Sequence, residues 1–236
     1  VIIGKLDGTT YTKGIPAINR NVYGGGEGGA IYGTAYVKVY NGRIGYRYEN
    51  NTYVEQLDDA KAGDNLLDRS GNVFGGGYVA NSYVDVSDLK MYGGIVRGGL
   101  YGGGEIGPIG RGTVNVNAPA PEGTFRNGVA KIYKGGATHV TLYKGHVLRD
   151  VFGGGRGFDN WDGEGYMTDD EKKTMDLSSK GYVFGSTEVR ILGGEVGTAD
   201  GVAKNFGNVF GGGNVGYVYS AEGTKTEKAV PGTDDK

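Results

Sequence analysis

The stretch that decides the fold is Val73-Phe74-Gly75-Gly76-Gly77, because close copies of it recur along the chain. Each copy places an aliphatic residue and an aromatic residue before three glycines, and the other four copies begin at Val22, Leu100, Val151 and Val209. Val183-Phe184-Gly185-Ser186 is a degenerate copy. Glycine accepts positive φ and lets backbones approach closely, so copies in phase indicate a repeated structural corner.

A second motif, small-x-Val-x-aliphatic, follows the glycines, as in Thr187-Glu188-Val189-Arg190-Ile191. Its central valines are Val37, Val84, Val114, Val140 and Val189, with a weaker sixth copy at Val218. Alternation with a period of two is typical of a strand with one buried face. We therefore expect the central valines to lie above one another in a continuous column.

The spacing of the central valines supports a stacked repeat. Successive steps are 47, 30, 26, 49 and 29 residues, so two steps are longer than the others by about twenty. A unit of this length cannot bury its own apolar face, and stacking solves that problem. Glycine at 50 of 236 positions argues against helices. The sequence predicts an all-β repeat β-solenoid, similar to a parallel β-helix, with an antiparallel β-sandwich of stacked hairpins as the alternative.

The same pattern predicts the organisation of the chain. Residues 1–20 are expected to be a lead-in or cap, residues 21–220 the repeats, and residues 221–236 a polar linker or tail. Two loop insertions at about 45–71 and 156–181 account for the long steps. Insertions in repeat proteins fall on one face that often binds partners, so these loops are the first candidates for function.

Composition excludes several classes of protein. The chain has no cysteine, which excludes disulfide scaffolds and cysteine-based zinc sites. Its net charge is −2, and nothing in that balance favours nucleic acid as a partner. No apolar run approaches the ~20 residues that a membrane span needs.

The second insertion holds a candidate calcium site at Asp159, Asp162 and Glu164. Carboxylates alternating around a glycine suit a flexible hard-cation site. However, Trp161 stands where an oxygen ligand is wanted, and a solvated loop explains the same residues. Calcium is therefore the one candidate cofactor, and we predict none otherwise.

Aromatic residues in the insertions form a candidate carbohydrate site. Tyr46, Tyr48 and Tyr53 cluster in the first insertion, and Trp161 is the only tryptophan. Exposed aromatic rings stack on sugars. The alternative is that these rings cover glycine-rich corners or stack between repeats.

Candidate catalytic groups are few. Glu27 and Glu105 follow glycine clusters, Asp85 and Glu188 are expected to point outward, and His139 and His146 lie seven residues apart. Neither a catalytic triad nor a metal-ligand spacing stands out among them. We therefore predict that the chain is not an enzyme, with a polysaccharide lyase or hydrolase as the less favoured alternative.

The N-V-F-G-G-G repeat followed by T-x-V-x-[VIL]-x-x-G, over roughly residues 21 to 219, resembles the glycine-rich repeats of large bacterial cell-surface proteins, among them β-helical adhesins and filament-like proteins. The resemblance implies an extracellular, surface-attached protein with a structural or adhesive role and no catalytic residues. Its expected partners are further copies or neighbouring repeats of a longer chain, and a glycan or host surface. A carbohydrate-binding module is the alternative function.

Overall fold

Three parallel sheets contain most of the strand residues in the computed structural model, which describes residues 1–4, 15–55, 70–79, 81–113, 130–134, 136–157, 181–198, 207–219 and 224–225. All regular secondary structure in these ranges is β-strand, so the predicted all-β class is confirmed there. The parallel pairing is compatible with a β-solenoid and differs from the antiparallel alternative. Within the same ranges, no helix has the length and apolar character that crossing a membrane requires.

Each pass of the chain contributes one strand to each sheet, and we call such a set of three strands a rung. Sheet A contains β1 (Ile2–Ile3), β4 (Ile31–Val39), β9 (Val84–Met91), β14 (Gly136–Leu142), β17 (Val183–Ile191) and β20 (Val218–Tyr219). Sheet B contains β2 (Ala17–Ile18), β5 (Arg43–Ile44), β10 (Ile95–Val96), β15 (His146–Val147) and β18 (Glu195–Val196). Sheet C contains β3 (Val22–Tyr23), β8 (Val73–Phe74), β11 (Leu100–Tyr101), β16 (Val151–Phe152) and β19 (Val209–Phe210).

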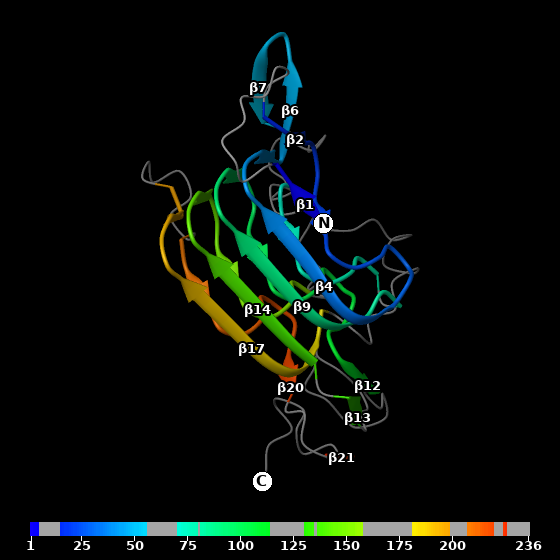
Figure 1. The fold of residues 1–236 in the computed structure, drawn as a ribbon. Coiled ribbons are helices and arrows are strands. Elements are labelled where there is room, and N and C mark those ends of the chain that lie inside the picture. Colours follow the sequence, from blue (N-terminus) through cyan, green and yellow to red (C-terminus); the bar gives the residue numbers. More distant parts are fainter. Residues whose placement is uncertain are drawn as a thin grey trace, which may run out of the picture.

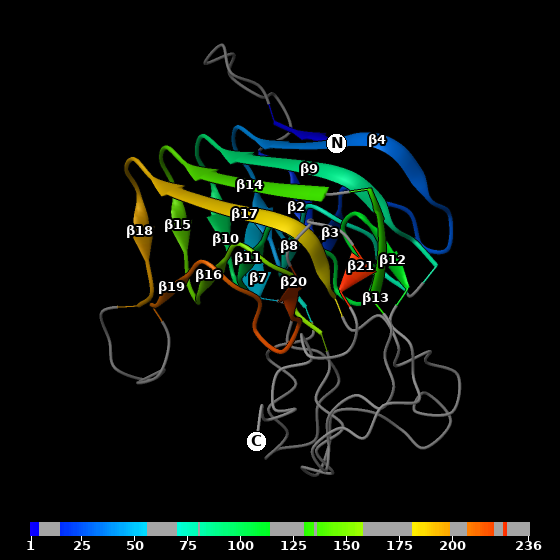
Figure 2. The ribbon, with the colours of Figure 1, turned by 90° about the horizontal axis from the view of Figure 1, so that it is seen from below.

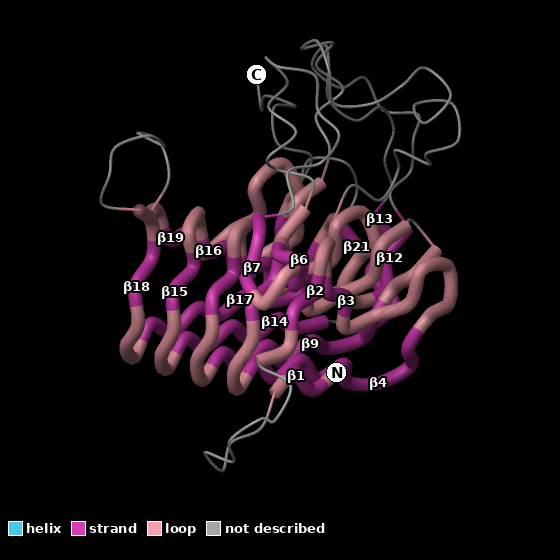
Figure 3. Tube along the Cα trace, turned by 90° about the horizontal axis from the view of Figure 1, so that it is seen from above, coloured by secondary structure: helices cyan, strands magenta, loops and turns pink. Residues whose placement is uncertain are grey.

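The rungs are stacked in chain order, from rung 1 (β1, β2, β3) to rung 5 (β17, β18, β19), and β20 begins a sixth (Figure 1). Figure 2 shows the strands of sheet A along the upper side of the stack and those of sheets B and C below them. The tube in Figure 3 shows the same turn of the chain repeated side by side. The stack therefore has two distinct ends, one at rung 1 and one at rung 5.

Two smaller antiparallel sheets depart from the stack. The hairpin of β6 (Tyr46–Glu49) and β7 (Thr52–Glu55) turns through Asn50 and Asn51, both with positive φ. Asparagine tolerates this left-handed conformation, which two-residue hairpin turns require. The other sheet joins β12 (Arg111–Thr113), β13 (Ala130–Lys134) and β21 (Thr224–Lys225).

The predicted valine column is correct in part. Val37, Val140 and Val189 do share one column, but Leu89 occupies the place predicted for Val84. Val84 pairs instead with Ile31, where a register shift in β4 changes the phase of the alternation. A register shift moves a residue to a different column, so alternation on each side of it matches the motif equally well.

The other two copies of the strand motif are also placed differently. Val218 pairs with Val183 at the start of β17 and does not reach the column of Val189. Thr113 belongs to antiparallel β12, outside the three parallel sheets, and Val114 lies outside the described residues. A hairpin strand alternates as a stacked strand does, so the motif could not separate them.

The core is a set of aliphatic columns that run from rung to rung. The buried members include Val37, Leu89 and Val140 of sheet A, together with Ile44, Val96 and Val147 of sheet B and Val73, Leu100 and Val151 of sheet C. A residue of each column covers the same residue of the next rung, so the apolar area of one rung is buried by its neighbours.

Small residues of sheet A face the glycines of sheet C across this core. A Cβ built on Gly75 would lie 2.9 Å from the Cβ of Ser87, and one on Gly102 would lie 2.9 Å from that of Thr138. Ser87 and Thr138 donate their hydroxyl hydrogens to the carbonyls of Gly102 and Gly153. The small residue of the strand motif therefore packs against a glycine of the aromatic-glycine motif, and each is needed for the contact.

The aromatic residues of the glycine corners form a continuous ladder. Its members are Tyr23, Phe74, Tyr101, Phe152 and Phe210, with ring centroids 4.9 to 5.1 Å apart and nearly parallel planes. A second ladder, Tyr40, Tyr92 and Tyr143, follows the strands of sheet A. Offset stacking of this kind adds to the area buried, so the aromatic ladder holds the rungs in register.

Asparagine and aspartate side chains bond neighbouring rungs just before the aromatic ladder. The Asn21 side chain accepts a hydrogen bond from the backbone N–H of Asn72, and the Asn72 side chain accepts one from Gly99. Asp150 accepts one from the backbone N–H of Asn208 in the same way. These bonds explain why a polar residue recurs at this position of the repeat.

Pairs of touching glycines mark the places where the chain leaves and rejoins the stack. The pairs are Gly45 with Gly71, Gly110 with Gly136, Gly157 with Gly181, and Gly197 with Gly207. A Cβ built on one glycine of each pair would lie 2.7 to 3.3 Å from a backbone atom of the other; the glycines tested are Gly71, Gly110, Gly181 and Gly207. Only glycine permits such contact, so each excursion starts and ends at one point of a rung.

Candidate functional site

The predicted tyrosines of the first insertion are brought together by the β6–β7 hairpin. The rings of Tyr48 and Tyr53 lie 4.9 Å apart across the hairpin, and the guanidinium of Arg43 lies 4.7 Å from the centre of the Tyr53 ring. Tyr53 also exchanges hydrogen bonds with the backbone of Ile15 through its hydroxyl. Of the three tyrosines, Tyr48 offers the most surface, with 46% of its area exposed.

Tyr46 has a different environment from the other two tyrosines. Its side chain is buried, and its hydroxyl lies 3.3 Å from the carboxylate of Glu55. Burial, followed by the charge of Glu55, raises the pKa of Tyr46. The buried ring of Tyr46 therefore has a packing role in the hairpin. Tyr48 is the residue through which this site could contact a sugar.

The remaining predicted ligands lie outside the described residues. These are Trp161 of the candidate carbohydrate site and the candidate calcium ligands Asp159, Asp162 and Glu164. Within the described ranges, no three histidine, aspartate or glutamate side chains gather into a group that could hold a metal ion.

The carboxylates considered for catalysis have structural surroundings. Glu105 is buried against Arg156, with 3.1 Å between the guanidinium and the carboxylate, and Tyr23 donates its hydroxyl hydrogen to the same carboxylate. Burial and the Glu105 charge raise the pKa of Tyr23. Glu27 is exposed, so the two glutamates differ in environment, and Asp85, expected to point outward, is buried. Asp85 points inward because it is in phase with Ser87, Leu89 and Met91, which are buried residues of β9.

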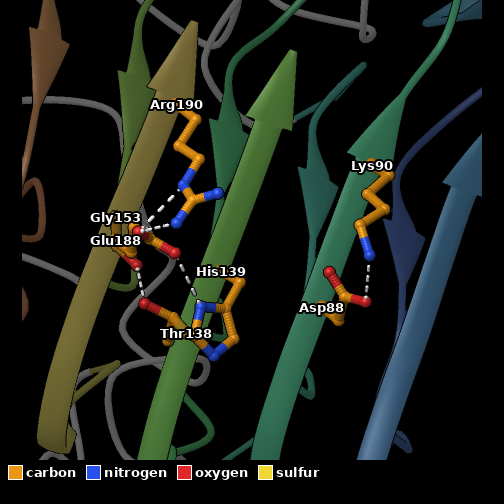
Figure 4. Close-up of polar contacts among 7 residues, drawn as sticks. All are labelled: Asp88, Lys90, Thr138, His139, Gly153, Glu188 and Arg190. Carbon is orange, nitrogen blue, oxygen red and sulfur yellow. Dashed lines mark hydrogen bonds and ion pairs between the residues drawn. The ribbon is translucent and has the colours of Figure 1, made fainter. Parts of the chain in front are cut away.

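The outer face of sheet A carries a row of polar side chains (Figure 4). Lys90 donates to Asp88 at 2.7 Å, and His139 lies 3.2 Å from Glu188, to which Arg190 donates two hydrogen bonds. Arg190, and then His139, lower the pKa of Glu188, and the bond to Asp88 raises the pKa of Lys90. Exposed pairs such as these fix side-chain positions but contribute little stability. His146 is separate, on β15, with its ring bonded to the carbonyl of Gly197.

The two ends of the stack differ in how well their inward aliphatic residues are covered. At the rung 1 end, Ile3 and Val22 are only 5% and 6% exposed. At the rung 5 end, Ile191 is 40% and Val209 46% exposed, and Phe210, the last ring of the ladder, is 43% exposed. We call the surface formed by Ile191, Leu192, Val209 and Phe210 the open end, because each of these apolar side chains is at least 40% exposed.

A stack of repeats exposes an unpaired edge at each end unless that end is capped or continued, but the sequence did not indicate which residues would be exposed there. Among the described residues, Phe210 is the last ring of the aromatic ladder, and it stacks on Phe152. Consistent with this, Gly211 and Gly212 have no atom within 4 Å of a built Cβ, whereas Gly153 and Gly154 are in close contact with rung 5.

Comparison with known proteins adds no assignment. No family model, curated protein sequence or solved structure matches the chain.

Proposed function

We propose that the chain is a β-solenoid with a structural or adhesive role in a secreted bacterial surface or filament protein, and that it is not an enzyme. It would act by holding its excursions on a stiff backbone and by associating with further copies. The localisation that goes with this role is the bacterial cell surface.

The observation that carries the proposal is the in-phase ladder of rings, glycines and backbone hydrogen bonds through five rungs. Gly24, Gly75, Gly102 and Gly153 each donate a backbone hydrogen bond of 2.8 to 2.9 Å to the next rung. Such ladders load many hydrogen bonds side by side, which suits a protein that bears force. Glu105 and Arg156, both buried, form an ion pair within the stack.

Surface staining of the cells that make the protein tests this role. Antibody raised against the purified chain is expected to label unpermeabilised cells. Labelling that appears only after permeabilisation would contradict the surface role, whatever the state of association of the protein.

Carbohydrate binding is the second candidate function, and the exposure of Tyr48 beside Tyr53 favours it. A glycan array probed with the purified chain is expected to give signals that Tyr48→Ala and Trp161→Ala each reduce. Tyr143→Ala is the matched control, because Tyr143 is also exposed but lies in the second ladder, away from the hairpin. Signals unchanged by both site variants would remove this candidate.

A further inference from the structure

The open edge of β17 is a regular strand with backbone groups available for pairing. Leu192 donates its N–H to Leu142 in rung 4, whereas Val183 donates to Tyr217 on the other side, beside β20. Backbone groups alternate sides along a strand, so Thr187, Val189 and Ile191 point their N–H and C=O groups away from rung 4. In the part of the chain that the structure describes, β20 covers only Val183 and Phe184 of this edge.

The opposite edge of sheet A is protected in three ways. β1 covers Lys38 and Val39 of β4, and the N-terminal amine of Val1 donates to the carbonyl of Tyr36. The register shift after Ile31 distorts the remainder of that edge. Bulges and short covering strands are devices that prevent edge pairing. Among the residues that the structure describes, the edge of β17 has neither beyond Val183 and Phe184.

We propose that the open end binds a second copy of this chain about a two-fold axis, with β17 pairing antiparallel to β17 of that copy around Val189. This proposal deepens the self-association of the proposed function and rests on it. A head-to-tail contact would need an uncovered rung 1 end, but Ile3 and Val22 there are already buried. Two open ends facing each other bury what each leaves exposed.

The register around Val189 is self-complementary in hydrogen bonding. Antiparallel pairing centred on Val189 places Thr187 opposite Ile191 of the second copy, and Val189 opposite itself. These residues are the ones whose backbone groups point to the open side, so they form the hydrogen-bonded pairs of the ladder.

The same register is self-complementary in charge. Glu188 falls opposite Arg190 of the second copy, and Arg190 opposite its Glu188, at the closely spaced pairs without backbone hydrogen bonds. Opposite charges at such cross-strand positions stabilise pairing, and like charges there are destabilising. If one strand moves along the other by two residues, neither Glu188 lies opposite an Arg190. The charges therefore favour this register.

The two-fold rotation also covers the apolar part of the open end. Val209 and Phe210 of sheet C lie in the same rung as β17, and they are exposed on the same side of the stack. Burial of apolar surface is the usual driving force for association, and the strand pairing fixes how the two copies are oriented.

Charge exchange tests the proposal. The full chain is expected to be a dimer in analytical ultracentrifugation, and Glu188→Arg and Arg190→Glu are each expected to raise the dimer dissociation constant roughly tenfold. A mixture of the two variants should form the heterodimer with wild-type affinity, because each arginine then faces a glutamate. Asp88→Lys and Lys90→Asp are matched controls, since they occupy the same rows in the middle of sheet A and should leave the dissociation constant unchanged.

A single cysteine gives a direct readout of the axis, because the chain contains no other. Val189→Cys is expected to form a disulfide-linked dimer on mild oxidation, since residues facing each other across a two-fold strand pair meet the distance that a disulfide needs. Val140 is the neighbour of Val189 in the same column, and Val140→Cys should run as a monomer in non-reducing denaturing electrophoresis. Circular dichroism of each variant checks that the fold is retained.

A monomer at all concentrations, a dimer indifferent to both charge variants, or a mixture that fails to restore the dimer would overturn the two-fold pairing. An end covered by another segment of this chain would give the first result. Surface labelling of cells is independent of these outcomes, so the structural role can survive the loss of this dimer, and the dimer can survive the loss of that role.

Discussion

Single glycines of the repeat are required by close backbone contact between rungs. A Cβ on Gly75 would lie 2.4 Å from the carbonyl oxygen of Gly102, so Gly75→Ala must push two rungs apart. We expect this substitution to lower the free energy of unfolding by about 3 kcal/mol in urea titration. Gly211→Ala is the matched control at the same position of rung 5, where a Cβ meets nothing, and a change within about 0.5 kcal/mol is expected. Equal losses in both variants would mean that contact between rungs is not the cause.

The phenol of Tyr23 makes stability depend on alkaline pH. Burial, and then Glu105, raise its pKa in the folded protein above the ordinary value of 10.0. Folding therefore favours the protonated phenol, and this stabilisation is complete below pH 10 and is lost as the pH rises above it. Burial likewise raises the pKa of Tyr101 to about 12, which acts in the same direction.

The contribution of Tyr23 can be isolated with Tyr23→Phe, which keeps the ring in the ladder and removes the ionisable group. Urea titrations between pH 8 and pH 11 should show a shallower loss of stability above pH 10 in the variant than in the wild type. Parallel pH profiles for the two proteins would show that Tyr23 does not carry the effect.

At the level of residues, the sequence predicted the glycine and aromatic positions that recur in every rung. It did not predict which residues far apart in the sequence lie side by side. The in-phase glycines and aromatics are recognisable because each rung imposes the same close contact on them. By contrast, Val84 and Leu89 both lie in alternating stretches, and only the pairing register of β4 with β9 decides which of them lies beside Val37. Likewise, nothing local to Glu105 indicates its partner Arg156, which is 51 residues away in sequence.

The aromatic ladder is the element whose stability depends most clearly on position in the stack. Phe152 is buried between Tyr101 and Phe210, whereas within the described ranges Phe210 stacks on Phe152 alone. Phe152→Ala is expected to lower the free energy of unfolding by about 3 to 5 kcal/mol, because it leaves a cavity between two rings. Phe210→Ala should lose less than half as much, because its ring is already partly in water. Thermal and urea unfolding measure both, and an equal effect would contradict the one-sided packing of Phe210.

Strands were easier to predict than their assignment to sheets. The motif at Thr138–Leu142 predicts a strand, and the structure has β14 there, paired in parallel with β9 and β17. The short strands of sheets B and C contain two residues each, too few for any periodicity to show. Their existence follows from the glycines beside them, and their pairing follows only from the closure of each rung.

For the whole molecule, the touching glycine pairs predict that an excursion can be removed without loss of the stack. A Cβ on Gly181 would lie 2.7 Å from the backbone nitrogen of Gly157, so the two ends of the second insertion are adjacent. Replacing residues 158–180 by one glycine should change the free energy of unfolding by less than about 1 kcal/mol, because loop entropy varies slowly with length. Circular dichroism and urea titration test this, and loss of cooperative unfolding would show that the excursion is part of the core.

The glycine pairs also divide the chain into two kinds of segment that tolerate substitution to different degrees. Substitutions within a rung are constrained by the rungs on both sides, whereas a segment between paired glycines can be exchanged for another peptide without disturbing any column. Such a chain is suited to the display of grafted epitopes in the laboratory.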